Sequence, residues 1–134
     1  MFEVLDIGAS GLLAQRTRLD TIAANIANMN TTRDAAGKLN PYRRRFAVFQ
    51  PGRPDNRDAP GVRVAKIDQD QSAFDVRYEP WNKDADPNGN VKYPNINMAI
   101  EYVNALEASR AYEANISLLE TSKAMINSTL RLIA

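Results

Sequence analysis

Three short stretches of this 134-residue chain carry side chains that could do chemistry. The stretch "GASGL" (8–12) holds a serine between two glycines, "PYRRRF" (41–46) gathers three arginines, and "DADPNG" (84–89) places two carboxylates in a turn-like sequence. The chain contains no histidine and no cysteine. Disulfides, zinc–thiolate sites and thiol nucleophiles are therefore excluded, and the commonest general base is missing. This composition argues against an enzyme, and we expect no cofactor and no small-molecule substrate.

Ser10 lacks the surroundings of a catalytic nucleophile. Its stretch does not match the G-x-S-x-G pattern of a nucleophile elbow, and the chain has no histidine to activate the hydroxyl. Gly8 and Gly11 would each cost a helix roughly 1 kcal/mol relative to alanine. We therefore expect these glycines to admit a neighbouring backbone, or to mark a weak helix start, and we expect no catalysis at Ser10.

The acidic stretch resembles part of a calcium-binding loop. Four residues match positions 1, 3, 5 and 6 of an EF-hand: Asp84, Asp86, Asn88 and Gly89. Position 12, which requires a bidentate glutamate, falls on Asn95, and Pro87 interrupts the loop. We expect an ordinary Asp/Asn/Gly turn here and no metal site.

The basic run consists of Arg43, Arg44 and Arg45, with aromatic residues on both sides. Arginine can bind phosphate through paired hydrogen bonds, so a nucleic-acid contact is one reading. The net charge of the whole chain is only +1, which gives no general reason to expect a polyanionic partner. We interpret the run as a solvated strand edge or a protein interface, and we expect no nucleic acid as partner.

The N-terminal segment, residues 1–30, is predicted to form one long helix. Four apolar residues recur every seven positions, as heptad position a does in a coiled coil: Leu5, Leu12, Leu19 and Ile26. Heptad position d is only half apolar, with Ile22 among its members. The seven-residue spacing favours a coiled-coil-like packing helix over an ordinary core helix.

The C-terminal segment, residues 96–134, is predicted to form a second and longer helix. Its stripe residues alternate by three and four positions: Tyr102, Ala105, Ser109, Tyr112, Ile116, Leu119, Lys123, Ile126, Leu130 and Ile133. Asn95 or Asn97 is a suitable N-cap, and Glu101 is well placed for the helix dipole. Such long helices cannot bury their stripes in a compact globule unless they pair with each other or with other subunits.

The region between the helices, residues 31–95, is predicted to be loop and short strands. Strands are expected at 46–50, 62–67 and 74–78, and the stretch 80–90 is expected to be turn-rich. The predicted fold is mainly α with a small β-rich insert, in which the two long helices pair as an antiparallel coiled-coil-like hairpin. Residues 1–30 and 96–134 would then form one discontinuous helical domain.

No apolar run reaches the roughly 20 residues that a membrane-spanning helix needs, so we expect a chain that does not span a membrane. Glu3 and Asp6 lie where a secretory signal would carry positive charge. We therefore expect that any export proceeds without a cleavable signal peptide.

Residues 9–32, "ASGLLAQRTRLDTIAANIANMNTT", resemble the N-terminal signature of the bacterial flagellar rod and hook protein family. The stretches 41–45, 61–64, 84–98 and 103–125 are similar to the proximal rod members of that family, and the short central region fits them as well. The resemblance implies a structural subunit of the flagellar basal body, located in the rod that crosses the periplasm. It also implies export through the flagellar type III apparatus and polymerisation with copies of itself and sibling rod proteins. Family members generally have termini that order on assembly.

Under this reading the terminal helices supply the subunit-packing residues. The N-terminal stripe comprises Leu5, Leu12, Leu19, Ile22 and Ile26. The C-terminal stripe comprises Tyr112, Ile116, Leu119, Ile126 and Leu130. Asn25, Asn28 and Asn115 flank the stripes, and we assign Asn25 a register role because an amide at a packing edge penalises misaligned neighbours. The alternative function is a soluble helical adaptor or chaperone-like binding module.

Overall fold

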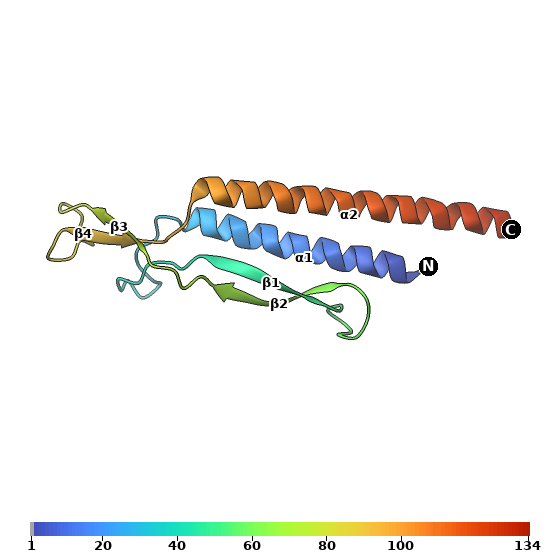
Figure 1. Ribbon diagram of the computed structural model, residues 1–134, viewed down its shortest axis with the longest axis horizontal. Helices are drawn as coiled ribbons and strands as arrows, with labels where there is room; N and C mark the ends of the chain where they lie inside the picture. Colours follow the sequence, from blue (N-terminus) through green and yellow to red (C-terminus); the bar gives the residue numbers. More distant parts are fainter. Residues whose placement is uncertain (1) are drawn as a thin grey trace.

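The computed structural model describes residues 2–134 and has one long helix at each end of the chain with four short strands between them (Figure 1). In chain order, the elements are α1 (Phe2–Ala27), β1 (Arg45–Pro51), β2 (Val62–Gln69), β3 (Asp75–Tyr78), β4 (Asn90–Tyr93) and α2 (Met98–Ile133). The prediction of two long terminal helices around a small β-rich insert is confirmed.

Asparagine side chains set two of the helix ends. At the start of α2, the Asn97 side chain accepts hydrogen bonds from the backbone N–H groups of Ala99 at 2.9 Å and Ile100 at 3.3 Å. Of the two asparagines proposed as N-cap, Asn97 is therefore the one used. At the end of α1, Asn28 Nδ2 donates to the carbonyl of Ala24 at 2.9 Å, which satisfies one of the last free carbonyls.

The two helices lie side by side, and both chain termini lie at the same end of the molecule (Figure 1). Residues early in α1 therefore meet residues late in α2. Gly8 lies against Leu119, Gly11 against Asn115, and Arg18 forms an ion pair with Glu107 at 3.0 Å. With 36 residues against 26, α2 extends beyond the start of α1.

The first hairpin, β1 with β2, lies along α1 on the side away from α2, so α1 is the central element (Figure 1). The strands are antiparallel, with Arg45 opposite Gln69 and Pro51 opposite Val62, and a bulge interrupts the register between Val48 and Phe49. Both strands were predicted, and both extend slightly beyond the expected bounds.

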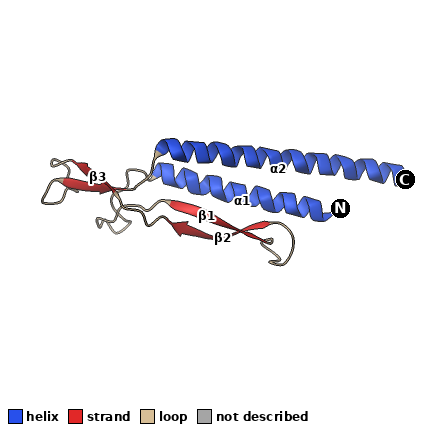
Figure 2. Cartoon of the chain, in the orientation of Figure 1, coloured by secondary structure: helices blue, strands red, loops and turns tan. Residues whose placement is uncertain are grey.

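The second hairpin, β3 with β4, lies beyond the ends of both helices (Figure 2). Strand β4 was not predicted, because its four residues fall at the end of a stretch that reads as turn. Its pairing with β3 makes it a strand, and Gly89 closes the turn with a φ of +82°, which glycine adopts without strain. Strand β3 begins at Asp75, opposite Tyr93, rather than at residue 74, whose place opposite would be taken by Pro94, a residue without a backbone N–H to donate.

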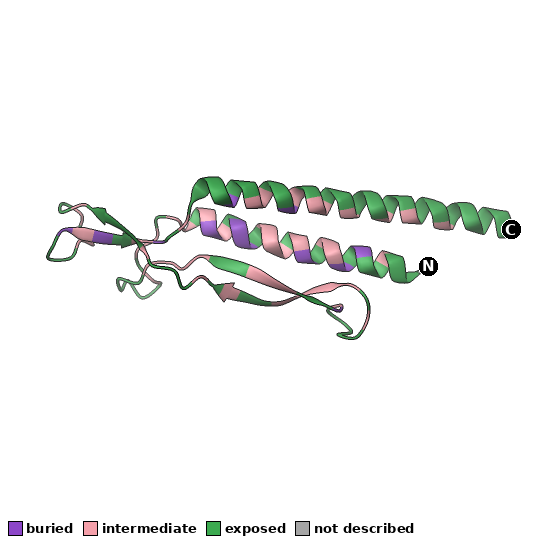
Figure 3. Ribbon diagram, in the orientation of Figure 1, coloured by how far each residue is buried: buried purple, intermediate pink, exposed green. Residues whose placement is uncertain are grey.

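Few apolar side chains are buried in this chain (Figure 3). Among residues 2–134, the buried hydrophobic residues are Ala14, Ile22, Val91 and Ala108. The accessible surface is 9084 Å², against about 7,000 Å² for a compact monomer of the same mass. The excess of about 2,000 Å² is more than the roughly 800 Å² that one partner buries in an interface of standard size. The chain by itself therefore has a small core.

Candidate functional site

A polar junction joins α1, α2 and the start of β1. Its centre is Asn25, whose side chain is fully buried. Asn25 Nδ2 donates to the carbonyl of Arg45 at 2.8 Å and to Glu101 Oε2 at 3.2 Å, while Oδ1 accepts from the Arg45 N–H at 2.9 Å. The hydroxyl of Tyr42 donates more weakly to the same oxygen, at 3.4 Å. The amide suits this place because it carries both a donor and an acceptor.

Glu101 is the second fully buried member of this junction. Its other carboxylate oxygen, Oε1, accepts a hydrogen bond from Arg44 Nε at 2.5 Å. Its place at the favourable end of the helix dipole was predicted from the sequence, but its burial was not. No signal in the helical periodicity marks it, because its partners come from distant parts of the chain.

Ser10 forms a second polar contact between α1 and the first hairpin. Its buried hydroxyl donates to the Ile7 carbonyl at 2.7 Å and accepts from the Val62 N–H at 3.1 Å. A Cβ added to Gly61 would lie 2.8 Å from the Ser10 oxygen, so the close approach depends on that glycine. Ser10 and Asn25 therefore hold the hairpin at two points roughly 22 Å apart along α1.

The basic run is used mainly within the chain. Arg43 stacks on Phe74 and donates to the carbonyls of Asp70 and Ser72, and Arg44 pairs with Glu101. Arg45 is the exposed member of the run, with its guanidinium 5.3 Å from the centre of the Tyr42 ring. Two of the three arginines therefore already have partners inside the molecule.

The acidic stretch forms a turn that ties the second hairpin to the loop after α1. Asp84 accepts hydrogen bonds from Thr32 at 2.7 Å and from Arg33 Nε at 2.8 Å, and its side chain is 8% exposed. The hydrogen bond from Thr32, followed by that from Arg33, holds the pKa of Asp84 below its usual value. Asp86 accepts from the backbone N–H groups of Asn88 and Asn90. Both carboxylates of the calcium-like motif are therefore engaged by the protein itself.

The line along which α1 meets α2 does not follow the leucines of heptad position a. It passes through Gly8, Gly11, Ile22 and Asn25, of which Gly8, Ile22 and Asn25 are buried. A Cβ at Gly8 would lie 2.7 Å from Leu119 Cδ2, and one at Gly11 would lie 2.9 Å from Asn115 Nδ2. The glycines thus admit side chains of α2, whereas the sequence analysis expected them to admit a backbone.

The other predicted packing residues keep part of their surface. Those left half-buried on α1 are Leu5, Leu12, Leu19, Ile26 and Asn28. Those left half-buried on α2 are Tyr112, Asn115, Leu119 and Ile126. Ile116 and Leu130 are exposed. At 100° per residue, the four a-position side chains lie beside the contact with α2 and away from the hairpin.

Helix α2 carries further exposed apolar side chains along its length. Those at least half exposed are Ile100, Tyr102, Val103, Leu106, Met125, Leu130, Leu132 and Ile133. At 100° per residue these side chains point to several sides of α2, and Tyr102, Val103 and Leu106 lie on the side away from the buried Glu101 and Ala108.

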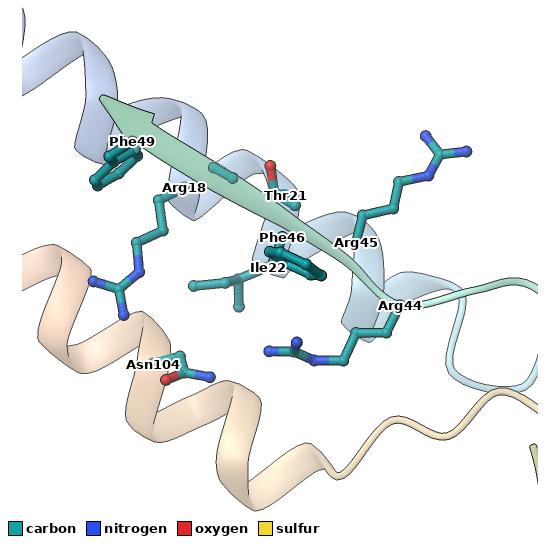
Figure 4. Close-up of a pocket in the computed structure, with 9 residues that line it drawn as sticks. Arg18, Thr21, Ile22, Arg44, Arg45, Phe46, Phe49 and Asn104 are labelled. Atoms are coloured by element: carbon teal, nitrogen blue, oxygen red, sulfur yellow. The ribbon is translucent and has the colours of Figure 1, made fainter. Parts of the chain in front are cut away.

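A groove of about 340 Å³ lies between β1 and α2, with α1 as its floor (Figure 4). Ile22, Phe46 and Phe49 provide its apolar surface, and Arg18 and Arg44 extend into it, whereas Arg45 points away. The groove lacks a cluster of acids or nucleophiles. Among residues 2–134, no three His, Cys, Asp or Glu side chains come together as metal ligands would.

Long helices, a small core and polar contacts that fix the hairpin to α1 are the features of an elongated structural protein. Residues 5–33 match the family described as flagella basal body rod protein, and residues 88–132 match the C-terminal family of flagellar basal body rod FlgEFG proteins. The chain belongs to the flagellar basal-body rod protein family, whose members are structural proteins and not enzymes.

Relatives of similar length support this assignment. The flagellar basal-body rod protein FlgC of Salmonella typhimurium is 40% identical, over 98% of this chain and 97% of the relative. FlgC of Borreliella burgdorferi is 38% identical over 99% and 97%, and FlgC of Bacillus subtilis is 34% identical over 98% and 97%. No helix within residues 2–134 has an apolar stretch long enough to cross a bilayer.

Proposed function

We propose that this chain is a structural subunit of the proximal rod of the flagellar basal body. In this proposal α1 and α2 form an antiparallel coiled-coil-like pair, and such pairs pack against copies of the chain and sibling rod proteins to build the axial drive shaft. The observation that carries the proposal is the set of exposed apolar side chains on several sides of α2, in a chain of this family with only a small core of its own. Heterologous packing of such pairs gives an open filament rather than a closed ring.

The contacts between the helices support the antiparallel pairing. The positions that meet, Gly8 with Leu119, Gly11 with Asn115 and Arg18 with Glu107, run in opposite directions along the two helices. Residues 1–30 and 96–134 act in this proposal as one discontinuous helical domain. The first hairpin packs against α1 of that domain, whereas the second hairpin lies beyond the ends of the helices.

The half-buried and exposed stripe residues are the ones that this proposal assigns to subunit contacts. Leu5, Leu12, Leu19 and Ile26 lie on α1 beside its contact with α2. Because Leu119 lies against Gly8, Leu130 falls past the start of α1. Asn25 takes a different part, because its hydrogen bonds are all made within the chain. Its register role therefore concerns how the hairpin and α2 align on α1.

The remaining parts of the proposal concern location and export. The chain would be exported by the flagellar export apparatus without a cleavable signal, and its helices would complete their order on assembly in the rod. Support comes from the weak core, because helices whose apolar faces lack partners gain stability mainly from packing against neighbours. The alternative of a helical adaptor is not favoured by membership of a rod family.

The test is incorporation into basal bodies. Leu19→Asp and Leu130→Asp place a charge on the proposed subunit contacts, and Ser128→Asp introduces the same charge at an exposed polar position nearby. We expect both leucine variants to be secreted at normal levels yet absent from isolated basal bodies, with loss of motility, while Ser128→Asp assembles normally. Normal assembly of both leucine variants would contradict the proposed packing surfaces.

A further inference from the structure

Among residues 2–134, Glu101 is the one charged residue that is fully buried. A buried carboxylate without a partner is strongly unfavourable, because the protein interior does not replace the hydration that the charge loses. The position of Glu101 in the first turn of α2 brings it against α1 whenever the two helices pair. Pairing of the helices therefore requires a cation for this carboxylate.

That cation comes from outside the helices. Arg44, immediately before β1, is the ion-pair partner of Glu101, and its own side chain is 23% exposed. The next residue, Arg45, supplies the backbone N–H and carbonyl that satisfy Asn25. If residues 44 and 45 leave the junction, Glu101 loses its charge partner and Asn25 loses two hydrogen bonds at once.

We propose that Asn25, Arg44 and Glu101 form a latch that makes pairing of α1 with α2 conditional on docking of the first hairpin. The first hairpin and the helix pair then form as one cooperative unit at the end of the molecule where α1 ends and α2 begins. This inference concerns the isolated chain and goes beyond rod assembly.

The position of the latch predicts which parts of the two helices are ordered in the isolated chain. It acts at the end of α1 and the start of α2, and the opposite ends of both helices, with the exposed Phe2, Leu132 and Ile133, lie far from it along the helices. A subunit built in this way has its helices fixed at one end, and the free ends are left for neighbouring subunits to order.

The test is hydrogen exchange of the full-length isolated chain, followed at the amides of α2 between residues 104 and 119. Arg44→Met leaves Glu101 buried without its cation, so we expect protection of these distant helix amides to fall by at least about tenfold together with that of the hairpin. The matched control is Arg18→Met, which breaks the exposed ion pair with Glu107 between the same helices and should leave protection nearly unchanged.

A second substitution separates a latch from an ordinary ion pair. Glu101→Leu removes the buried charge, so the helices no longer need Arg44, and adding Arg44→Met to this variant should cause no further loss in α2. The proposal is overturned if Arg44→Met lowers α2 protection no more than Arg18→Met does, if it does so equally in the Glu101→Leu background, or if the wild-type helices show no protection. These measurements use the unassembled chain, so their failure is distinct from a failure to enter basal bodies.

Discussion

The side chain of Asn25 pairs with the backbone of Arg45 as a neighbouring strand would: Nδ2 donates to the carbonyl at 2.8 Å and Oδ1 accepts from the N–H at 2.9 Å. One helical side chain thus takes the place of a strand partner at the first residue of β1. The arrangement fixes where the hairpin begins relative to α1, and it does so without an apolar core.

Replacing Asn25 should therefore destabilise the chain more than replacing its neighbouring asparagine. Asn25→Ala removes the partner of the Arg45 N–H and carbonyl and a hydrogen bond to the buried Glu101, and we expect a loss of about 2–3 kcal/mol in the free energy of unfolding. Asn28→Ala removes two local hydrogen bonds at a half-buried helix end, to the Ala24 carbonyl and from the Thr31 hydroxyl, and should cost less than about 1 kcal/mol. Urea unfolding followed by circular dichroism measures both, and equal losses would contradict the assignment.

We expect Ser10 to stabilise the docking of the first hairpin on α1 rather than the helix α1 itself. Ser10→Ala removes the acceptor of the Val62 N–H, and we expect a loss of about 1 kcal/mol with faster exchange of the Val62 amide. Thr17→Ala removes only an exposed hydroxyl that bonds its own helix, and it should leave that amide unchanged. Unchanged Val62 exchange in Ser10→Ala would show that the hydroxyl does not hold the strand.

The glycines of α1 should tolerate a methyl group but not a long side chain. In Gly8→Ala the new Cβ would lie 2.7 Å from Leu119 Cδ2 and 3.0 Å from its Cγ, so the Leu119 side chain must shift, and the gain in helix propensity of about 1 kcal/mol offsets that cost. In Gly8→Leu we expect a loss of about 2 kcal/mol, because α2 must move away. Ala9→Leu, at an exposed position, is the control, and thermal unfolding compares the three.

Asp84 should make the second hairpin sensitive to acid. Its pKa in the folded chain lies below the ordinary value of 3.8, because Thr32 and Arg33 favour the charged form. The unfolded chain then binds more protons, so this stabilisation is full well above pH 4 and is lost as the pH falls through the lower folded pKa. Wild type should be more stable than Asp84→Asn at pH 6, and the difference should shrink toward pH 3. A difference that stays constant between these pH values would contradict the ion-pair assignment.

Much of the fold could be predicted from local patterns. The three-and-four spacing of apolar residues gave both helices almost to their ends, and Asn97 was among the two candidate caps. Strands β1 and β2 were also expected, whereas β4 was missed because its strand character depends on its partner β3. The seven-residue recurrence of leucine predicted a packing helix, yet the side chains that meet α2 centre on the two glycines and Ile22.

The sequence by itself determined the helices, the absence of histidine and cysteine chemistry, and the resemblance to rod proteins. These features follow from residue types and from spacings of a few residues, which can be recognised within one helical turn or one motif. Only the tertiary structure decided what Ser10, Asn25, Arg44 and Glu101 do, because each meets its partner across 20 to 76 residues of chain. The contribution of a polar side chain to stability depends on whether it is buried and on which groups hydrogen-bond to it. Neither is determined by its neighbours in sequence.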